Sequence, residues 1–313
     1  MSAVPGVRFS PLVQMVAQAR RPSRWWIAWL VALLIIHFIT PLGTFLGTIV
    51  LGDPAATDAW YPYVAAFTAL TVLLTLFLWV RFKEGRPLST VGFRPRWDWA
   101  RPLLGFGVGA GLAAVVVGLG LIIGVYQGGQ SAHPISGIGA IAALVPLILL
   151  SLLTAAGEQA ISSGYMLQSG ARQMPSWIAV LGTCVIVAMQ QTLHPVALLN
   201  LVLFGILTGL VALQQGSLWL VVGLQAGWYY FQDNVFGLPR GGITEPAAIL
   251  SIGPTPDSST ALSGGQFGLT TGLLTTGVLA VAVAVALIRL RATKPAVPID
   301  VPIRVLTQYS IPH

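Results

Sequence analysis

Glu158 is the residue whose type and position point most directly to chemistry. It lies in a strongly apolar run over about residues 138–168, and no other carboxylate occurs within that run. An ionisable side chain at membrane depth costs roughly a few kcal/mol or more, so such a residue usually has a function. The alternative is a glutamate that is neutralised or paired with a polar neighbour and serves packing alone.

Polar side chains recur in two later apolar segments with the same helical spacing. On a helix, residues four positions apart share one face. The pairs with this spacing are Glu158 with Ser162, Gln190 with His194, and Gln225 with Tyr229. We expect the three faces to line one cavity inside a helix bundle.

This set of residues is chemically sufficient for hydrolysis. A carboxylate beside a neutral imidazole can hold a water molecule and take its proton, as Glu158 and His194 would do. Amide and phenol groups donate hydrogen bonds to a developing oxyanion, a role open to Gln190, Gln225 and Tyr229. The same side chains would also suffice for a buried polar network with a purely structural role.

Two other chemistries fit the sequence less well. A metal site needs three or four ligands, and the cluster offers only Glu158 and His194, so we predict no metal and no other cofactor. A nucleophilic Ser162 or Ser163 is possible. Hydroxyls in membrane helices, however, usually bond to a carbonyl one turn back.

The composition places the chain in the membrane. Of its 313 residues, 55% are hydrophobic and only 8% are charged, whereas a soluble domain carries about 25% charged residues. The net charge of +7 does not indicate nucleic-acid binding, because the basic residues lie outside the apolar runs. The single cysteine, Cys184, excludes an internal disulfide and a cysteine-based metal site.

The apolar runs predict an all-α fold, a polytopic membrane bundle of about eight transmembrane helices. The runs cover about residues 27–50, 60–80, 102–125, 138–168, 177–195, 196–213, 218–231 and 268–288. Four glycines in the third run, at positions 105, 107, 109 and 111, make small-residue pairs that let helices approach closely. Residues 232–267 are rich in Gly, Pro, Ser and Thr and predict a long loop.

The basic residues predict the orientation. If the N-terminus is cytoplasmic, the inner segments hold all but one of the 16 Lys and Arg residues, and only Arg240 lies outside. This asymmetry satisfies the positive-inside rule. We therefore predict a cytoplasmic basic arm over 1–24, a helix bundle over 25–290 and a cytoplasmic tail over 291–313.

Three short motifs occur in order along the helical runs. They read Glu158-Gln159-Ala160-Ile161-Ser162-Ser163-Gly164-Tyr165-Met166-Leu167-Gln168, then Gln190 to His194, then Gln225 to Tyr229. They resemble the CAAX prenyl protease and bacteriocin-processing (CPBP, or Abi) family of intramembrane glutamic proteases. Its first motif is Glu-Glu, three residues and Arg, usually followed by Gly-Tyr-Leu and often Gln. The resemblance covers about residues 85–290.

The resemblance implies roles for these residues. Glu158 and His194 match the pair thought to activate water, and Gln225 and Tyr229 stand where the family has the histidine and asparagine of an oxyanion hole. Gln159 and Ser163 occupy the positions of a supporting Glu–Arg ion pair. This chain therefore lacks both charges of that pair together.

Three functions remain open. The first is an intramembrane endopeptidase that uses Glu158 and His194. The second is an inactive relative, a pseudoprotease, that binds a membrane peptide or a partner protein. The third is an enzyme acting on an isoprenoid or another lipid. The resemblance implies a membrane peptide or a prenylated or lipid substrate, and a bacterial cell membrane as the location.

Overall fold

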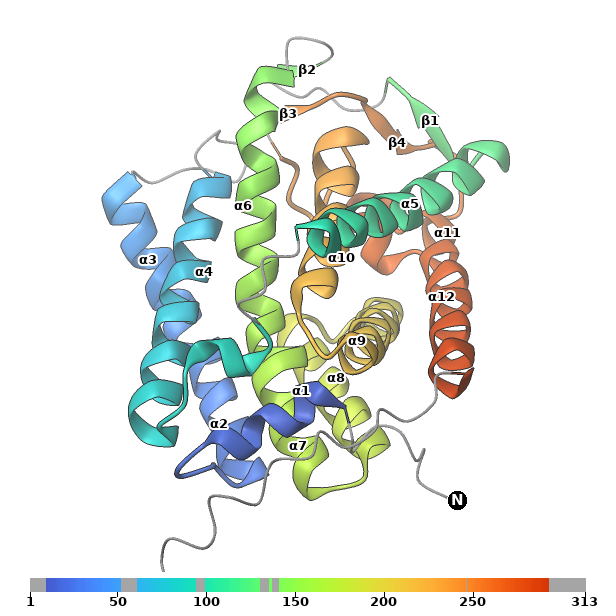
Figure 1. Cartoon of the computed structure of the whole chain (residues 1–313). Coiled ribbons are helices and arrows are strands. Elements are labelled where there is room, and N and C mark those ends of the chain that lie inside the picture. Colours follow the sequence, from blue (N-terminus) through green and yellow to red (C-terminus); the bar gives the residue numbers. More distant parts are fainter. Residues whose placement is uncertain are drawn as a thin grey trace, which may run out of the picture.

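The computed structural model describes residues 10–51, 61–93, 99–129, 135–136, 141–245 and 247–292. The predicted ends of the arm and tail, residues 1–9 and 293–313, lie outside the described residues. The described chain folds into a bundle of helices with two small strand pairs at one end (Figure 1). The predicted all-α class is therefore confirmed.

The bundle is built from helices of very different lengths. They are α1 (Pro11–Gln14), α2 (Trp25–Leu34), α3 (Thr40–Leu51), α4 (Tyr61–Leu78), α5 (Ala100–Ile122), α6 (Ile141–Gln159), α7 (Leu167–Gln173), α8 (Ser176–Gln191), α9 (Pro195–Gln215), α10 (Trp219–Tyr230), α11 (Thr260–Ser263) and α12 (Leu273–Ala292). The strands are β1 (Tyr126–Gly128), which pairs antiparallel with β4 (Ile252–Pro254), and β2 (Ile135–Ser136), which pairs parallel with β3 (Ala247–Ala248). π-Helical turns join α2 to α3 and α6 to α7.

Six helices of the described chain are long and apolar enough to cross a membrane. They are Trp25–Leu51, Pro62–Glu84, Ala100–Ile122, Leu144–Gln173, Pro195–Gln215 and Gly265–Leu290. Each of the eight predicted runs contains a helix, but α8 and α10 are shorter than the roughly 20 residues that a bilayer requires. The chain is thus an integral multi-pass membrane protein.

Helix α10 is held against α5 by backbone contact. Figure 1 shows α5 crossing α10 and running across the direction of α6. The residues at the crossing are Gly105 and Gly109 of α5 and Gly223 and Gly227 of α10. A Cβ atom at Gly109 would lie 1.9 Å from the Leu224 carbonyl oxygen, and one at Gly227 would lie 2.1 Å from the Phe106 carbonyl oxygen. Only glycine permits this approach, which fixes the position of α10.

The alternate glycines of α5 do not share this role. A Cβ atom at Gly107 or Gly111 would meet nothing within 4 Å. The predicted close contact is therefore confirmed for Gly105 and Gly109, and it is wrong for Gly107 and Gly111. The reason is the helical repeat, which turns residues two positions apart to different faces.

Part of the predicted N-terminal arm packs against the bundle. The Ser10 hydroxyl donates a 2.6 Å hydrogen bond to the Leu213 carbonyl, and Leu12 and Val13 are buried. The reason is that the apolar side chains of α1 pack against α7 and α9.

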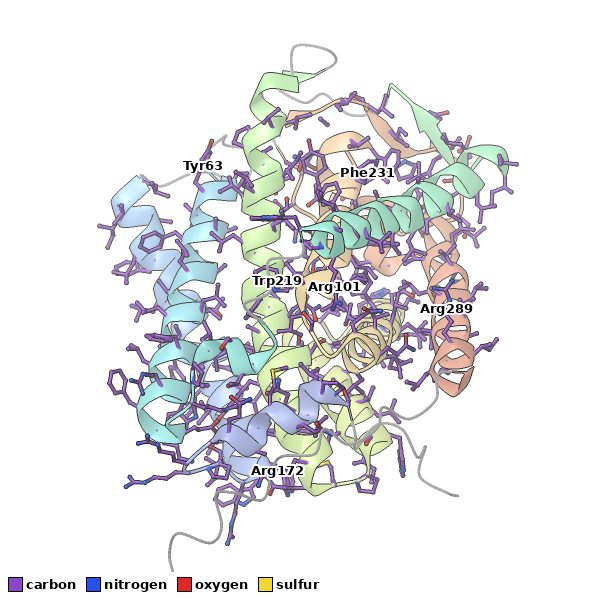
Figure 2. The ribbon with its side chains drawn as sticks, viewed as in Figure 1. Tyr63, Arg101, Arg172, Trp219, Phe231 and Arg289 are labelled. Carbon is purple, nitrogen blue, oxygen red and sulfur yellow. The ribbon has the colours of Figure 1, made fainter. Side chains whose placement is uncertain are left out.

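Basic side chains gather at one end of the molecule. The Lys83 ammonium bonds to the Ser23 hydroxyl at 2.7 Å, and the Arg21 amide donates to the Glu84 carbonyl at 3.2 Å. Gln173, next to Arg172, is bonded to the Ser23 carbonyl. Figure 2 shows Arg172 at this end and Tyr63 near the opposite end of the bundle.

Candidate active site

Glu158 lies at the end of α6, where the helix widens into the π-helical turn Ala160–Met166. Such turns occur frequently at functional sites. The flanking residues Gly157 and Gln159 are buried, whereas Glu158 itself is exposed and lines two partly open cavities. The apolar run predicts a carboxylate buried at membrane depth. The structure places this carboxylate against cavities that a ligand or water can enter.

Two cavities meet at Glu158. The first has a volume of about 410 Å³, and its polar lining includes Glu158, Gln159, Ser163, Gln190, Gln225 and Tyr229. The second has a volume of about 570 Å³, and its lining includes Glu158, His194, Tyr229, Arg240 and Glu245. Glu158 and Tyr229 line both, so the carboxylate stands between a mostly apolar space and a more polar one.

Hydrogen bonds join α6 to α10 at the carboxylate. Glu158 Oε2 accepts from Gln225 Nε2 and, at 3.2 Å, from the Tyr229 hydroxyl. Gln159 Nε2 donates to Gln225 Oε1, and both of these amide side chains are buried. The uncharged Gln159 thus supports the site through an amide chain in place of an ion pair.

The two serines behave as helix residues. Ser162 Oγ donates to the Glu158 carbonyl at 2.8 Å, one turn back, and the Ser163 side chain is buried. This geometry uses the Ser162 proton within the helix. It gives no support to the serine-nucleophile alternative.

His194 is placed differently from the prediction. Helix α8 ends at Gln191, Thr192 is extended (φ −162°), and Pro195 begins α9, so Gln190 and His194 do not share a helical face. The prediction of one continuous helix through them is wrong, because proline favours the first position of a new helix. Gln190 lines the first cavity and His194 the second.

The imidazole of His194 caps α9. Its Nδ1 accepts a 3.4 Å hydrogen bond from the Ala197 amide, and its side chain is exposed. In the neutral ring, accepting at Nδ1 assigns the proton to Nε2. The structure therefore brings Glu158, Gln225 and Tyr229 into direct contact, and it sets His194 on the wall of the adjoining cavity.

Arg240 is the residue at this site that the sequence analysis missed. Its Nε donates to Asp233 Oδ2 at 2.9 Å, and its guanidinium lies 4.1 Å from the centre of the Tyr229 ring. One feature of the sequence could have identified Arg240: it is the one basic residue that the charge pattern leaves outside the predicted inner segments. The predicted loop thus returns to cover the cavity beside Glu158.

Carboxylates surround Arg240 in the segment after α10. Burial raises the pKa of Asp233 to about 6, although the nearby Arg240 opposes the shift. Burial and the charge of Asp233 together raise the pKa of Glu245 to about 7, again against Arg240. The charge of this cluster therefore changes near neutral pH.

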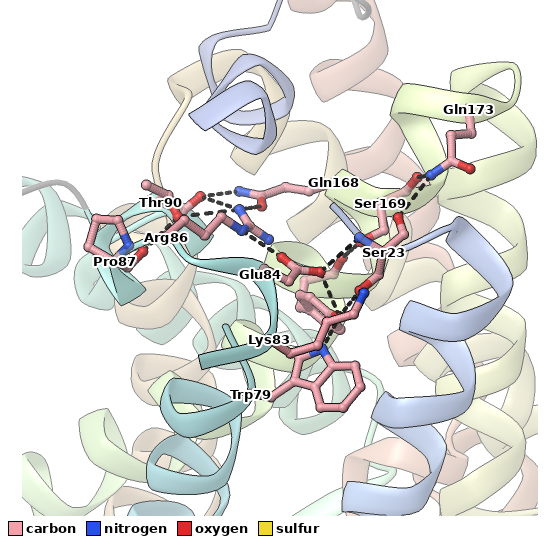
Figure 3. A network of polar contacts seen from close by, with 11 residues as sticks. Ser23, Trp79, Lys83, Glu84, Arg86, Pro87, Thr90, Gln168, Ser169 and Gln173 are labelled. Atoms are coloured by element: carbon pink, nitrogen blue, oxygen red, sulfur yellow. Dashed lines mark hydrogen bonds and ion pairs between the residues drawn. The ribbon is translucent and has the colours of Figure 1, made fainter. Parts of the chain in front are cut away.

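A second polar network anchors the motif helix to the end of α4 (Figure 3). Arg86 Nε and Glu84 Oε2 form a 2.7 Å ion pair that is fully buried. The Tyr165 hydroxyl donates to Glu84 at 3.0 Å, and Arg86 Nη1 donates to Gln168 at 3.3 Å. Trp79 Nε1 in turn donates to the Tyr165 hydroxyl at 2.6 Å. Tyr165 and Gln168 of the first motif therefore position the helix that carries Glu158.

The described residues contain no group of three or more His, Cys, Asp or Glu side chains that could hold a metal ion. The side chains that line the two cavities include a carboxylate, an imidazole, amides, a phenol and a guanidinium.

Comparison with known proteins connects this geometry to a family. Residues 140–231 match the family model described as type II CAAX prenyl endopeptidase Rce1-like. No curated protein and no solved structure matches the chain. The matched segment contains all three motifs, from Glu158 to Tyr229, and supports the resemblance that they indicate. The chain is therefore a multi-pass membrane protein whose residues 140–231 are similar to the type II CAAX prenyl endopeptidase Rce1-like family.

Proposed function

We propose that this protein is an intramembrane endopeptidase in which Glu158 activates the attacking water. One observation carries the proposal: an accessible carboxylate stands between two cavities inside a membrane helix bundle, within the segment similar to the CAAX endopeptidases. The substrate class is a membrane-embedded peptide, with prenylated proteins as the family's example.

The two carboxylate oxygens of Glu158 can have different roles. Oε2 of Glu158 accepts the two hydrogen bonds from α10 that the structure describes. This leaves Oε1 to take a proton from water as the water oxygen bonds to the substrate carbonyl carbon. When the C–N bond breaks, the same proton passes from Glu158 to the leaving amine, so the carboxylate is regenerated.

His194 completes the water site in this proposal. With Nδ1 accepting from the Ala197 amide, a neutral His194 offers its Nε2 proton to the second cavity. That donor can hold the water oxygen or the substrate carbonyl while Glu158 takes the proton. Gln190 would bind substrate from the first cavity, whose lining it shares with Gln225.

The proposed setting is a bacterial cell membrane with both termini in the cytoplasm. The support for this orientation is the basic end of the bundle, where Lys83 bonds to Ser23 just before the first span and the Arg21 amide bonds to Glu84 at the end of the second. The positive-inside rule assigns such an end to the cytoplasmic side. Glu158 is then reached from within the bilayer plane or from the loop side.

The test is cleavage of defined membrane peptides in proteoliposomes. Wild type is incubated with a prenylated and an unprenylated form of one peptide, and products are identified by mass spectrometry. We expect Glu158→Gln to reduce cleavage by about 10²–10⁴-fold, because the near-isosteric amide cannot accept the proton. Ser162→Ala is the matched control on the same helix face and should keep most of the activity. Equal cleavage by wild type and Glu158→Gln would refute the proposal.

A second function, binding without hydrolysis, is favoured by one observation. Glu158 takes the Tyr229 hydroxyl hydrogen and one of the two Gln225 amide hydrogens, so most of the donor capacity of this pair is used within the protein. In this case wild type and Glu158→Gln would bind the peptides equally and neither would release product.

A further inference from the structure

Arg240 is presented to the site by a rigid turn. The Arg240 amide donates to the Ile243 carbonyl at 2.8 Å, and the Ile243 amide donates back to Arg240 at 3.2 Å. Gly241 and Gly242 between them have φ values of +62° and +88°, the left-handed pair that a type I′ turn requires. The Gly241 amide also donates to the Phe267 carbonyl at 3.2 Å. The turn therefore fixes the point from which the Arg240 side chain extends.

The guanidinium itself is oriented on two sides. Asp233 holds Nε, and the Tyr229 ring supports the guanidinium plane. The Asp233 side chain is only 5% exposed, whereas that of Arg240 is 32% exposed. An arginine present only to neutralise Asp233 would be expected to be buried with it. The exposed part of Arg240 instead forms part of the wall of the cavity that Glu158 also lines.

The site has a specific need for such a group. Hydrolysis of a peptide bond places negative charge on the carbonyl oxygen, and that charge requires preorganised donors. At the expected donor positions, the Tyr229 hydroxyl and one of the two Gln225 amide hydrogens are directed to Glu158 Oε2, which leaves one Gln225 N–H outside these bonds. Ser163 carries no charge either. Arg240 supplies a cation with several hydrogen-bond donors on the wall of the same cavity.

We propose that Arg240 is a catalytic residue that stabilises the oxyanion formed on the scissile carbonyl. This inference rests on the endopeptidase function proposed above. The long loop after α10 would then supply the electrophilic group from outside the three motifs. In the step itself, the water oxygen bonds to the carbonyl carbon, the C=O π electrons move to oxygen, and the Arg240 N–H groups donate to that oxygen.

The test compares the binding of two probes in detergent micelles. One probe is the membrane peptide with its scissile amide. Its binding is measured with protein that also carries Glu158→Gln, so that the peptide is not cleaved. The other has a phosphonate group in place of that amide, a tetrahedral anion that resembles the intermediate. The measured quantity is the ratio of the two dissociation constants. A structural role for Arg240 would change both constants alike and leave the ratio unaltered.

We expect Arg240→Gln to reduce the preference for the phosphonate by at least about tenfold, because charge-assisted hydrogen bonds to the anion are lost. Arg240→Lys should lose less, since the charge remains. Arg240→Lys also provides the test if Arg240→Gln does not fold, because a lysine can still pair with Asp233. Arg172→Gln removes the same charge at the exposed inner turn and should leave the ratio at the wild-type value.

Two outcomes would overturn the inference, and they differ. An unchanged ratio in folded Arg240→Gln and Arg240→Lys would remove Arg240 from the reaction, while cleavage by wild type would keep the endopeptidase proposal intact. If the Arg240-containing protein bound neither probe and cleaved no peptide, the endopeptidase proposal itself would be wrong. The proposed catalytic role of Arg240 would then be wrong as well.

Discussion

Replacing Gly109 by alanine should separate α5 from α10 and disturb the candidate site. The added Cβ would lie 1.9 Å from the Leu224 carbonyl oxygen and 2.7 Å from the Trp228 amide nitrogen, where ordinary contact is 3.4–4 Å. Because both neighbours are backbone atoms, no side-chain rotation relieves the clash. The helices must part by about 1.5 Å, from the shortfall between 1.9 Å and ordinary contact.

The magnitude follows from two opposing terms. Overpacking of this kind costs about 1–3 kcal/mol, and the better helix propensity of alanine returns about 0.5–1 kcal/mol. A net loss of roughly 1–2 kcal/mol is therefore expected. The displacement should also shift Gln225 and Tyr229 relative to Glu158, and a misplacement of about 1 Å can cost about 10²-fold in rate.

Gly107→Ala and Gly111→Ala are the matched controls on the same helix. A Cβ atom at either position meets nothing within 4 Å, so both variants should be as stable as wild type or slightly more stable. Thermal unfolding in detergent and peptide cleavage in proteoliposomes measure the two effects. If Gly109→Ala were as stable and as active as Gly107→Ala, the reasoning from backbone contact would be refuted.

Three further predictions concern charged or capping residues. Glu84→Gln should lower the free energy of unfolding by about 3–5 kcal/mol, because Arg86 then stays buried without its anion; a thermal unfolding midpoint equal to that of wild type would contradict this. Stability should fall as pH rises from about 4.5 to 7. The reason is that the folded protein, in which the pKa of Glu245 is about 7, binds more protons in this pH range than the unfolded chain does. In a pH series of unfolding midpoints, Glu245→Gln should flatten this dependence. His194→Asn should keep the unfolding midpoint, since asparagine also caps a helix, but its cleavage rate should fall about 10²-fold. His194→Ala should lower both the midpoint and the cleavage rate. Full activity in His194→Asn would exclude the imidazole from catalysis.

The fold could be predicted from the sequence because the membrane imposes a simple rule. Every run of about 20 apolar residues must satisfy its backbone hydrogen bonds within a helix, and each of the eight predicted runs contains a helix. The contact of Glu158 with Gln225 and Tyr229 follows the same rule, because residues four apart on α10 share one face. The 218–231 run already indicates a short α10, whereas the 177–195 run does not show that α8 is shorter than a bilayer requires.

The remaining features depend on contacts between segments far apart in the chain. The break before His194 requires knowing that α8 stops at Gln191, which a continuous apolar run conceals. Arg240 belongs to a segment without helical periodicity, so nothing in its spacing places it over Tyr229. The Glu84–Arg86 pair lies in a stretch that the basic residues around it mark as an exposed inner loop, although the structure buries both side chains.

The joint activation of water by Glu158 and His194 is tested most directly by an experimental structure in a lipid environment, at a resolution that shows ordered water. We predict one water molecule within about 3.2 Å of both Glu158 Oε1 and His194 Nε2, the distance of a hydrogen bond to each. We also predict that this water occupies the second cavity, which both side chains line. Carboxylate and imidazole groups more than about 10 Å apart, too far for one water to bridge, or directed toward lipid, would contradict the claim that Glu158 and His194 activate water together.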